Sequence, residues 1–147
     1  LDNPLHYRTG NLGIRRTFVR GSDEDFQNLY GKSDAQEVYK EHIQLLFDRF
    51  LTTHGANGVN LHTRNFTDIS IPPQIQPLST IGAGDNFNAG IIYGLLKYDV
   101  RHADLPSLDQ DTWGKIIRCG MDLASEVCQS YDNYISKEFA AKYVSQS

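Results

Sequence analysis

The chain has 147 residues, a mass of 16.6 kDa and a formal net charge of −4. This length suits one domain with a core but lies well below that of a typical two-lobed enzyme. Hydrophobic residues make up 39% of the chain and charged residues 22%, which excludes disordered and collagen-like proteins. Lysine and arginine are scattered, with Arg15-Arg16 as the one doublet, so we expect no nucleic-acid partner.

Hydropathy and cysteine spacing indicate the cellular compartment. The longest apolar run, near Ile91 to Leu96, is far too short to span a membrane, and no signal peptide is recognisable. Cys119 and Cys128 fall on one predicted helix, where nine residues separate them by roughly 13 Å. That distance rules out a disulfide between them, and no spacing suits zinc. We therefore expect a reducing cytoplasm.

The N-terminal part of the chain changes character near residue 17. Residues 1–16 show neither helical nor strand periodicity, so we expect an irregular or incompletely represented segment there. Thr17 to Val19 reads as a short strand, and the acidic run "SDEDF" follows it. Next, apolar residues recur at helical intervals and predict a helix from Asp34 to Asp48, with Ser33 and Gln36 as a capping box.

The middle of the chain predicts extended structure. "FLTTHGANGVNLHT" reads as strand, glycine turn and strand, because Val59, Leu61 and Thr63 alternate with polar residues. The stretch from Ile69 to Leu78 contains three prolines, which favours an extended connection or an edge strand.

Helices dominate the C-terminal half. After Asp85 the pattern predicts a helix with one apolar face made of Phe87, Ile91, Ile92, Leu95 and Leu96. A second helix covers residues 111–129 and buries Trp113 near its start, and a short last helix covers Lys137 to Val144. Helices that alternate with short strands favour an α/β fold over an all-β fold.

The segment "STIGAGDNFNAG", residues 79–90, carries the clearest chemistry. Gly82, Ala83 and Gly84 bring backbone N–H groups close to a ligand, and the helix that follows aims its positive end at the same point, which predicts an anion site. Asp85 would repel a phosphate there, so we interpret it as a base that accepts a proton from an attacking alcohol. The alternative is a tight turn with Asp85 as a plain N-cap. Of the two neighbouring asparagines, Asn88 has two interpretations: it supports the loop, or it is a polar residue on the helix surface, which is the simpler account.

This segment resembles the signature of the ribokinase-like, or PfkB-type, carbohydrate kinases, Asp-Thr-x-Gly-Ala-Gly-Asp followed by Phe and Gly. The matching positions are Thr80, Gly82, Ala83, Gly84, Asp85, Phe87 and Gly90. Ser79 departs from the pattern. Since the first Asp of the signature helps to bind a monovalent cation in many members, the departure argues against potassium dependence here.

Two further motifs agree with the family in type and order. "THGANGV" resembles its nucleotide loop at Thr53, Gly55 and Gly58. An ordinary hairpin turn with the same glycines is the alternative. For His54, within this loop, the two interpretations are contact with a phosphate or ribose and no role at all. "SDEDFQNLYG" resembles the Asn-x-x-Glu segment, with Asp25 or the neighbouring Glu24 as the residue that organises magnesium through water. A solvated acidic turn is the alternative for that segment.

The resemblance implies the C-terminal, nucleotide-binding half of a Rossmann-like, ribokinase-type three-layer α/β sandwich over residues 17–147. It implies transfer of the γ-phosphoryl group of ATP to a sugar hydroxyl, with Mg²⁺ as the metal ion. Gly120 and Ala124 would leave space for adenine, although helix packing explains their small size equally well. The expected partners are a small-molecule sugar and, at most, a second copy of the chain. The alternatives are a nucleoside or vitamin kinase of the same family and a non-catalytic, nucleotide-binding regulatory relic.

Overall fold

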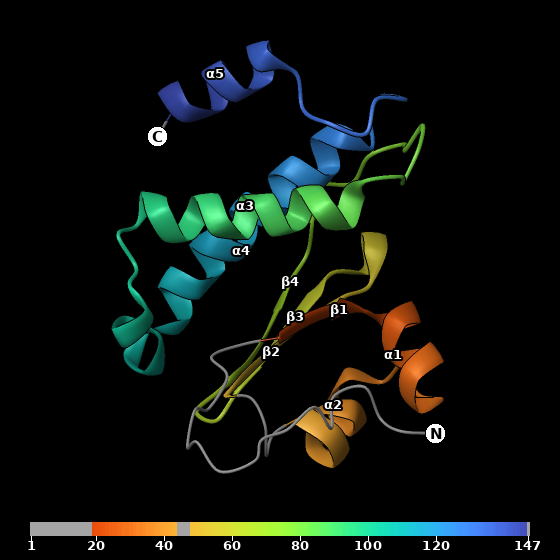
Figure 1. Cartoon of the computed structure of the whole chain (residues 1–147), viewed down its shortest axis with the longest axis vertical. Coiled ribbons are helices and arrows are strands. Elements are labelled where there is room, and N and C mark those ends of the chain that lie inside the picture. The colour runs from red at the N-terminus through yellow and green to blue at the C-terminus, as the bar shows by residue number, and fades with distance from the viewer. Residues whose placement is uncertain (1–18, 44–47, 147) are drawn as a thin grey trace. The chain divides into compact units, whose positions relative to one another are not determined.

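The computed structural model describes residues 19–43 and 48–146, so the predicted irregular segment 1–16 lies outside the described residues. The chain divides into two compact units, residues 1–69 and residues 70–147. We call them the sheet unit and the helical unit (Figure 1).

The sheet unit holds four strands in the order β1-β2-β3-β4. Their bounds are Val19–Ser22, Arg49–Thr53, Val59–Thr63 and Thr67–Ser70. β1 runs parallel to β2, and β2 runs antiparallel to β3, with Leu51 opposite Leu61. The predicted strand, glycine turn and strand is therefore confirmed, and β4 forms the edge ahead of the proline-rich stretch.

The helix predicted over Asp34 to Asp48 is wrong in length and in its cap. α2 covers only Ala35–Val38 and continues as the π-helical turn η2, Tyr39–Ile43, while Asp48 is not helical and β2 begins directly after it. The wider π turn uses more residues per turn than an α-helix, so the spacing of apolar residues overstated the regular helix. Asp34, and not Ser33, caps α2, because its side chain accepts a hydrogen bond from the Glu37 N–H at 2.9 Å.

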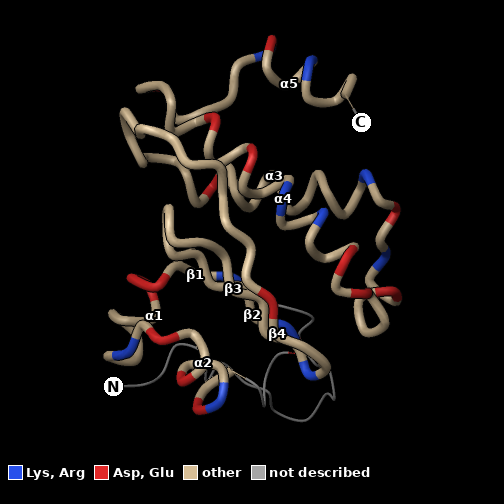
Figure 2. The backbone as a smooth tube through the Cα atoms, turned by 180° about the vertical axis from the view of Figure 1, so that it is seen from behind, with Lys and Arg blue, Asp and Glu red and all other residues tan. Residues whose placement is uncertain are grey.

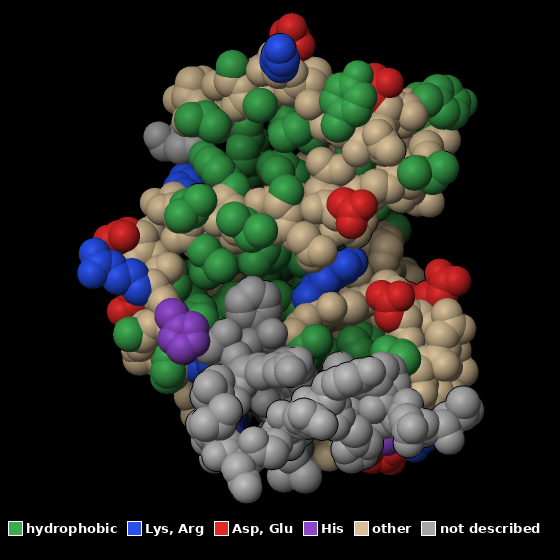
Figure 3. All heavy atoms as spheres, in the orientation of Figure 1, with side chains coloured by type: hydrophobic (Ala, Val, Ile, Leu, Met, Phe, Trp, Pro, Cys, Tyr) green, Lys and Arg blue, Asp and Glu red, His purple; other side chains and the backbone are tan. Residues whose placement is uncertain are grey.

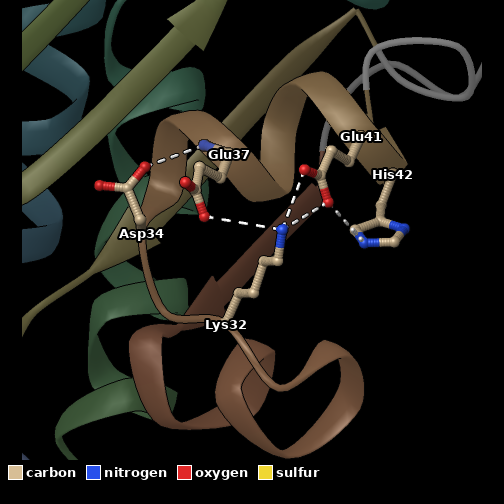
Figure 4. Close-up of polar contacts among 5 residues, drawn as sticks. All are labelled: Lys32, Asp34, Glu37, Glu41 and His42. Carbon is tan, nitrogen blue, oxygen red and sulfur yellow. Dashed lines mark hydrogen bonds and ion pairs between the residues drawn. The ribbon is translucent and has the colours of Figure 1, made fainter.

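An exposed ion-pair network spans the start of this helical segment. Lys32 Nζ lies 2.9 Å from a carboxylate oxygen of Glu41 and 3.7 Å from one of Glu37 (Figure 4). The hydrogen bond to Glu41 raises the pKa of Lys32 and lowers that of Glu41. Because all three groups face solvent, the network orients the side chains and adds little stability.

The core of the sheet unit is aromatic and aliphatic. Its buried cluster consists of Phe26, Ala35, Val38, Ile43 and Phe50. Phe26 comes from α1, Asp23–Tyr30, and its ring meets that of Phe50 edge-on at 4.9 Å between centroids, a favoured aromatic geometry. His62 of β3 is also buried, with its ring 5.3 Å from that of Tyr39. Burial lowers the pKa of His62.

The helical unit contains α3, Ala83–Lys97, the 3₁₀ segment η4, His102–Ser107, α4, Gln110–Val127, and α5, Lys137–Ser145. These bounds confirm the three predicted helices, and Trp113 is buried near the start of α4 as expected. Tyr143 of α5 donates a hydrogen bond to Asp122 of α4 at 2.7 Å. That bond and burial raise the pKa of Tyr143, so α5 is tied to α4 by a side chain that stays protonated.

α3 and α4 cross at glycines. A Cβ atom on Gly90 would lie 2.4 Å from the Cys119 carbonyl oxygen and 2.6 Å from the Gly120 Cα, and one on Gly120 would lie 2.8 Å from the Phe87 ring. At Gly90 backbone therefore meets backbone, and no side chain fits at that position, while the Phe87 ring packs on Gly120.

The apolar face predicted for α3 is only partly buried. Phe87 and Ile91 face α4 and are buried, whereas Ile92 is 60% exposed and Leu96 is 76% exposed, so the predicted apolar face extends beyond the part that α4 covers. The reason is geometric: the close crossing on Gly90 covers a narrow stripe of α3. Figure 3 shows hydrophobic side chains at the surface of this unit.

Charge is dispersed over the described chain. Figure 2 shows basic and acidic residues distributed along both units, and the first turn of α1 contains Asp23, Glu24 and Asp25.

Within the residues that the structure describes, no helix has the length and apolar character needed to traverse a bilayer.

The glycine crossing predicts a stability difference between two matched substitutions. Gly90→Ala should lower the free energy of unfolding by about 1 to 3 kcal/mol, because the new methyl group overlaps α4 backbone. Gly114→Ala, on α4 with nothing within 4 Å of the added Cβ, should raise it by up to about 1 kcal/mol through helix propensity. Urea denaturation measures both values, and equal effects would contradict the crossing.

The buried His62 predicts a pH effect on stability. The unfolded chain protonates this histidine near its ordinary pKa of 6.5, whereas the folded chain resists protonation. Unfolding free energy should therefore fall as the pH drops below that value. His62→Gln, which cannot titrate, should flatten this part of the profile, while His102→Gln in η4 serves as the exposed control. An unchanged profile in His62→Gln would contradict the assignment.

Candidate functional site

The segment before α3 is anchored to the end of α4. Backbone N–H groups of Leu78 and Ser79 both donate to the carbonyl oxygen of Cys128, at 2.8 and 3.4 Å. The Ser79 hydroxyl accepts a hydrogen bond from the Ile81 N–H at 3.2 Å. These bonds fix the direction in which the backbone enters the glycine turn.

The glycine turn leads directly into the first turn of α3. The Ala83 N–H donates to the Thr80 carbonyl at 3.2 Å, which closes the turn. Gly82 has the left-handed conformation, with φ of 82°, and a Cβ there would lie 2.9 Å from the Asn133 carbonyl oxygen. Both the backbone angle and the space exclude a side chain, which explains the glycine.

α3 begins earlier than the sequence suggested. Gly82 is its N-cap, so Ala83 and Gly84 belong to the first helical turn and Asp85 is the third residue of the helix. The alternative in which Asp85 is the N-cap is therefore wrong. Asp85 is exposed, and its carboxylate lies at the helix end where unpaired N–H groups and the positive dipole end converge.

The N-terminus of α3 differs from those of the other described α-helices. α1, α2, α4 and α5 are each capped by a serine or aspartate side chain, namely Ser22, Asp34, Asp109 and Ser136. Gly82 provides no side chain, so nothing of that kind occupies the first-turn N–H groups of α3. This helix end can accept an external anion.

One asparagine, Asn86, supports the turn. Asn86 Nδ2 donates to the Gly82 carbonyl oxygen at 2.9 Å and to the Asn133 carbonyl oxygen at 3.2 Å. Asn88 is exposed, which agrees with the simpler interpretation of a polar residue on the helix surface. Sequence reasoning missed Asn133 because nothing in the sequence signals a contact across 47 positions.

The loop "THGANG" in the sheet unit forms a short hairpin connection. The 3₁₀ turn η3, Gly55–Asn57, joins β2 to β3, and the His54 N–H donates to the Gly58 carbonyl at 2.9 Å. Gly55 and Gly58 have positive φ angles of 55° and 123°. Thr53, at the end of β2, accepts a hydrogen bond from Arg20 at 3.0 Å.

His54 is held on both sides of its ring. Its Nδ1 lies 3.4 Å from a carboxylate oxygen of Asp23, and its Nε2 lies 3.1 Å from Asn60 Nδ2. His54 therefore ties the loop to the start of α1, a contact that the sequence did not reveal.

The acidic residues proposed for magnesium lie in the first turn of α1. Asp25 forms a capping box with Ser22: its carboxylate accepts the Ser22 N–H at 2.8 Å, and its own N–H donates to the Ser22 hydroxyl at 3.1 Å. The first of these bonds lowers the pKa of Asp25. Glu24 is exposed beside it. Among the described residues, no group of three or more metal-ligating side chains is present.

The small residues of α4 have a packing role. Gly120 faces the Phe87 and Ile91 side chains of α3, so its size follows from the helix crossing. Ala124, one turn later, is half-buried. That both residues border a nucleotide stays a prediction.

Comparison with known proteins places these features in a family. The profile of the "pfkB family carbohydrate kinase" matches residues 16–139. A 1-phosphofructokinase of Vibrio cholerae serotype O1 is 29% identical over 89 residues, which cover 56% of this chain and 28% of that protein.

Solved structures share the fold. A fructokinase from Vibrio cholerae O395, in a fructose-, ADP- and calcium-bound form, superposes with a TM-score of 0.69 at 23% identity, over 86% of this chain and 40% of that one. An aminoimidazole riboside kinase from Salmonella enterica, complexed with aminoimidazole riboside and an ATP analogue, gives 0.69 at 18% identity, over 85% and 41%.

These matches confirm the predicted α/β ribokinase-like fold, and the chain spans about two fifths of the length of those solved structures. The profile covers well over half of the sequence, including both glycine loops and the acidic turn. The chain belongs to the PfkB family of carbohydrate kinases.

Proposed function

We propose that this chain provides the nucleotide-binding and catalytic part of an ATP-dependent sugar kinase. The observation that carries the proposal is the glycine turn at the N-terminus of α3, which has no side-chain cap and presents an exposed carboxylate, Asp85, on its first turn. Family membership provides the reaction class, phosphoryl transfer to an alcohol.

The glycine turn offers groups for both reactants, the phosphoryl group of ATP and the attacking sugar hydroxyl. The backbone N–H groups of Gly82 and Gly84 would hold the oxygens of the transferred phosphoryl group and stabilise the charge that develops on them, while the Ala83 N–H closes the turn on Thr80. Asp85 would accept the proton of the sugar hydroxyl as its oxygen attacks the γ-phosphorus and ADP leaves. A carboxylate is useful there because it turns a weakly nucleophilic hydroxyl toward the phosphorus and removes its proton.

The sheet unit would contribute to nucleotide and metal binding. Within the sheet unit, Thr53, Gly55 and Gly58 would form a wall beside the nucleotide. Within the helical unit, Gly120 and Ala124 of α4 would leave space for adenine. Asp25 and Glu24 would orient magnesium through water, which fits the reluctance of Mg²⁺ to lose its hydration shell. One oxygen of Asp25 is used by the capping box, which leaves the other for a metal-bound water.

Two rival functions share this site. A nucleoside or vitamin kinase of the family would use the same turn and base, and the similarity to an aminoimidazole riboside kinase keeps that rival open. A regulatory, nucleotide-binding relic would keep the glycines and need no base. The presence of Asp85 favours an active kinase over the relic.

Replacement of the proposed base separates chemistry from binding. In the complete enzyme, Asp85→Asn should lower turnover by about 10² to 10⁴-fold, the usual share of a general base, and leave ATP affinity nearly unchanged. The control is Asp111→Asn, an exposed aspartate in the first turn of α4, which should keep full turnover. Turnover of Asp85→Asn close to that of the wild type would reject the assignment.

A panel of sugars, nucleosides and vitamins, assayed with Mg²⁺ and ATP, identifies the acceptor.

The hydroxyl at Ser79 predicts the response to monovalent cations. Where the family signature has a carboxylate, this chain has a serine whose hydroxyl accepts a local backbone N–H. Kinase activity should therefore be nearly the same in potassium and in tetramethylammonium at equal ionic strength. Strong activation by potassium would show that other oxygens form a cation site.

A further inference from the structure

Asn86 makes the densest set of polar contacts at the glycine turn. Its backbone N–H and its side-chain Nδ2 both donate to the Gly82 carbonyl oxygen, at 3.0 and 2.9 Å. The same Nδ2 donates to the Asn133 carbonyl oxygen at 3.2 Å. Both side-chain acceptors are carbonyl oxygens, which only the NH₂ end of the carboxamide can satisfy, so the contacts fix its orientation.

The two carbonyl groups that Asn86 joins belong to segments in direct contact. A Cβ on Gly82 would lie 2.9 Å from the Asn133 carbonyl oxygen and 3.1 Å from the Asn133 Cβ. The segment after α4 that contains Asn133, which we call the Asn133 turn, therefore lies against the glycine turn and leaves no room for a side chain at Gly82. Asn86 is the side chain that bonds both sides of this contact.

The contact fixes the direction of one peptide group of the turn. Because the peptide group is planar, a fixed Gly82 carbonyl also fixes the direction of the Ala83 N–H, which closes the turn on Thr80.

We propose that Asn86 is a positioning residue for phosphoryl binding, which locks the Gly82–Gly84 turn against the Asn133 turn. The inference rests on the proposed function, because it takes the glycine turn as the phosphate site. Asn86 acts through the backbone of the turn and need not touch the phosphoryl group itself.

The chain offers a matched control. Asn88 lies on the same helix two positions later and is exposed, so Asn88→Ala removes an identical side chain without a turn contact. Asn86→Ala removes both side-chain hydrogen bonds. Asn86→Asp keeps the shape but sets an acceptor against two carbonyl oxygens, so it should perturb the turn more than alanine does.

The experiment uses the full chain, with circular dichroism to verify that each variant is folded. Backbone amide signals are first recorded without ligand. Asn86→Ala should shift the signals of Gly82, Gly84 and the Asn133 turn, while Asn88→Ala should leave them in place. Absence of a shift in Asn86→Ala would overturn the inference, whatever the nucleotide result.

Titration with Mg²⁺ and ATP follows, with the Gly84 and Asp85 amide signals as the reporters. Asn86→Ala should weaken ATP binding by about tenfold, as expected for the loss of hydrogen bonds that order a charged site, and Asn86→Asp should weaken it further. Asn88→Ala should bind like the wild type. Shifted turn signals with unchanged ATP affinity would overturn the inference and leave the proposed function standing. A wild-type chain that does not bind ATP would defeat the proposed function, and the phosphoryl role of Asn86 with it.

Discussion

The close crossing of α3 and α4 is the constraint on which the candidate site depends. Because Gly90 brings backbone against backbone at the Cys119–Gly120 segment, the C-terminal end of α4 has a fixed place relative to the start of α3. The Cys128 carbonyl then accepts the N–H groups of Leu78 and Ser79, and the turn that follows α4 lies against Gly82. The proposed anion site is thus built from backbone groups, which the packing of α3 against α4 holds in place.

The two candidate motifs of the sheet unit, the glycine loop and the acidic turn, are ordered by contacts within that unit. The hairpin between β2 and β3 fixes the glycine loop, and His54 joins this loop to Asp23 at the start of α1. The capping box of Ser22 and Asp25 then fixes the first turn of α1. The loop and the acidic turn are therefore connected through one histidine, so a change at His54 would reach both. This link gives the loop histidine a structural role whether or not it meets a nucleotide.

Local patterns predicted the elements, and long-range contacts account for what the sequence could not provide. The hairpin, α4 and α5 follow from alternation, helical periodicity and cap residues that lie within a few positions of one another. The mistaken helix over Asp34 to Asp48 has a local cause as well, because periodicity does not distinguish an α-helix from a π turn. Ile92 and Leu96 share an apolar stripe with Ile91, but the width of the covered stripe depends on how closely α4 approaches. The choice between Asn86 and Asn88 depends on Asn133, which the sequence places 47 residues away.

Several candidate site residues have a role in the fold that explains their identity without a ligand. Gly120 is small because Phe87 packs on it, Asp25 caps a helix, and the glycines at 55 and 58 suit a hairpin turn. Each of these residues would be present in a protein that binds no nucleotide, so none argues strongly for nucleotide binding.

Asp85 and the uncapped turn at Gly82 are different, since the chain caps its other described α-helices with Ser or Asp side chains. An acidic side chain in a first helical turn contributes only about 0.3 to 1 kcal/mol, and a serine at position 82 would satisfy the N–H groups more directly. A glycine is required there only because Asn133 and the left-handed backbone exclude every other residue. The fold therefore keeps this helix end open at some cost to local stability, which is the arrangement expected where an anionic substrate completes the cap.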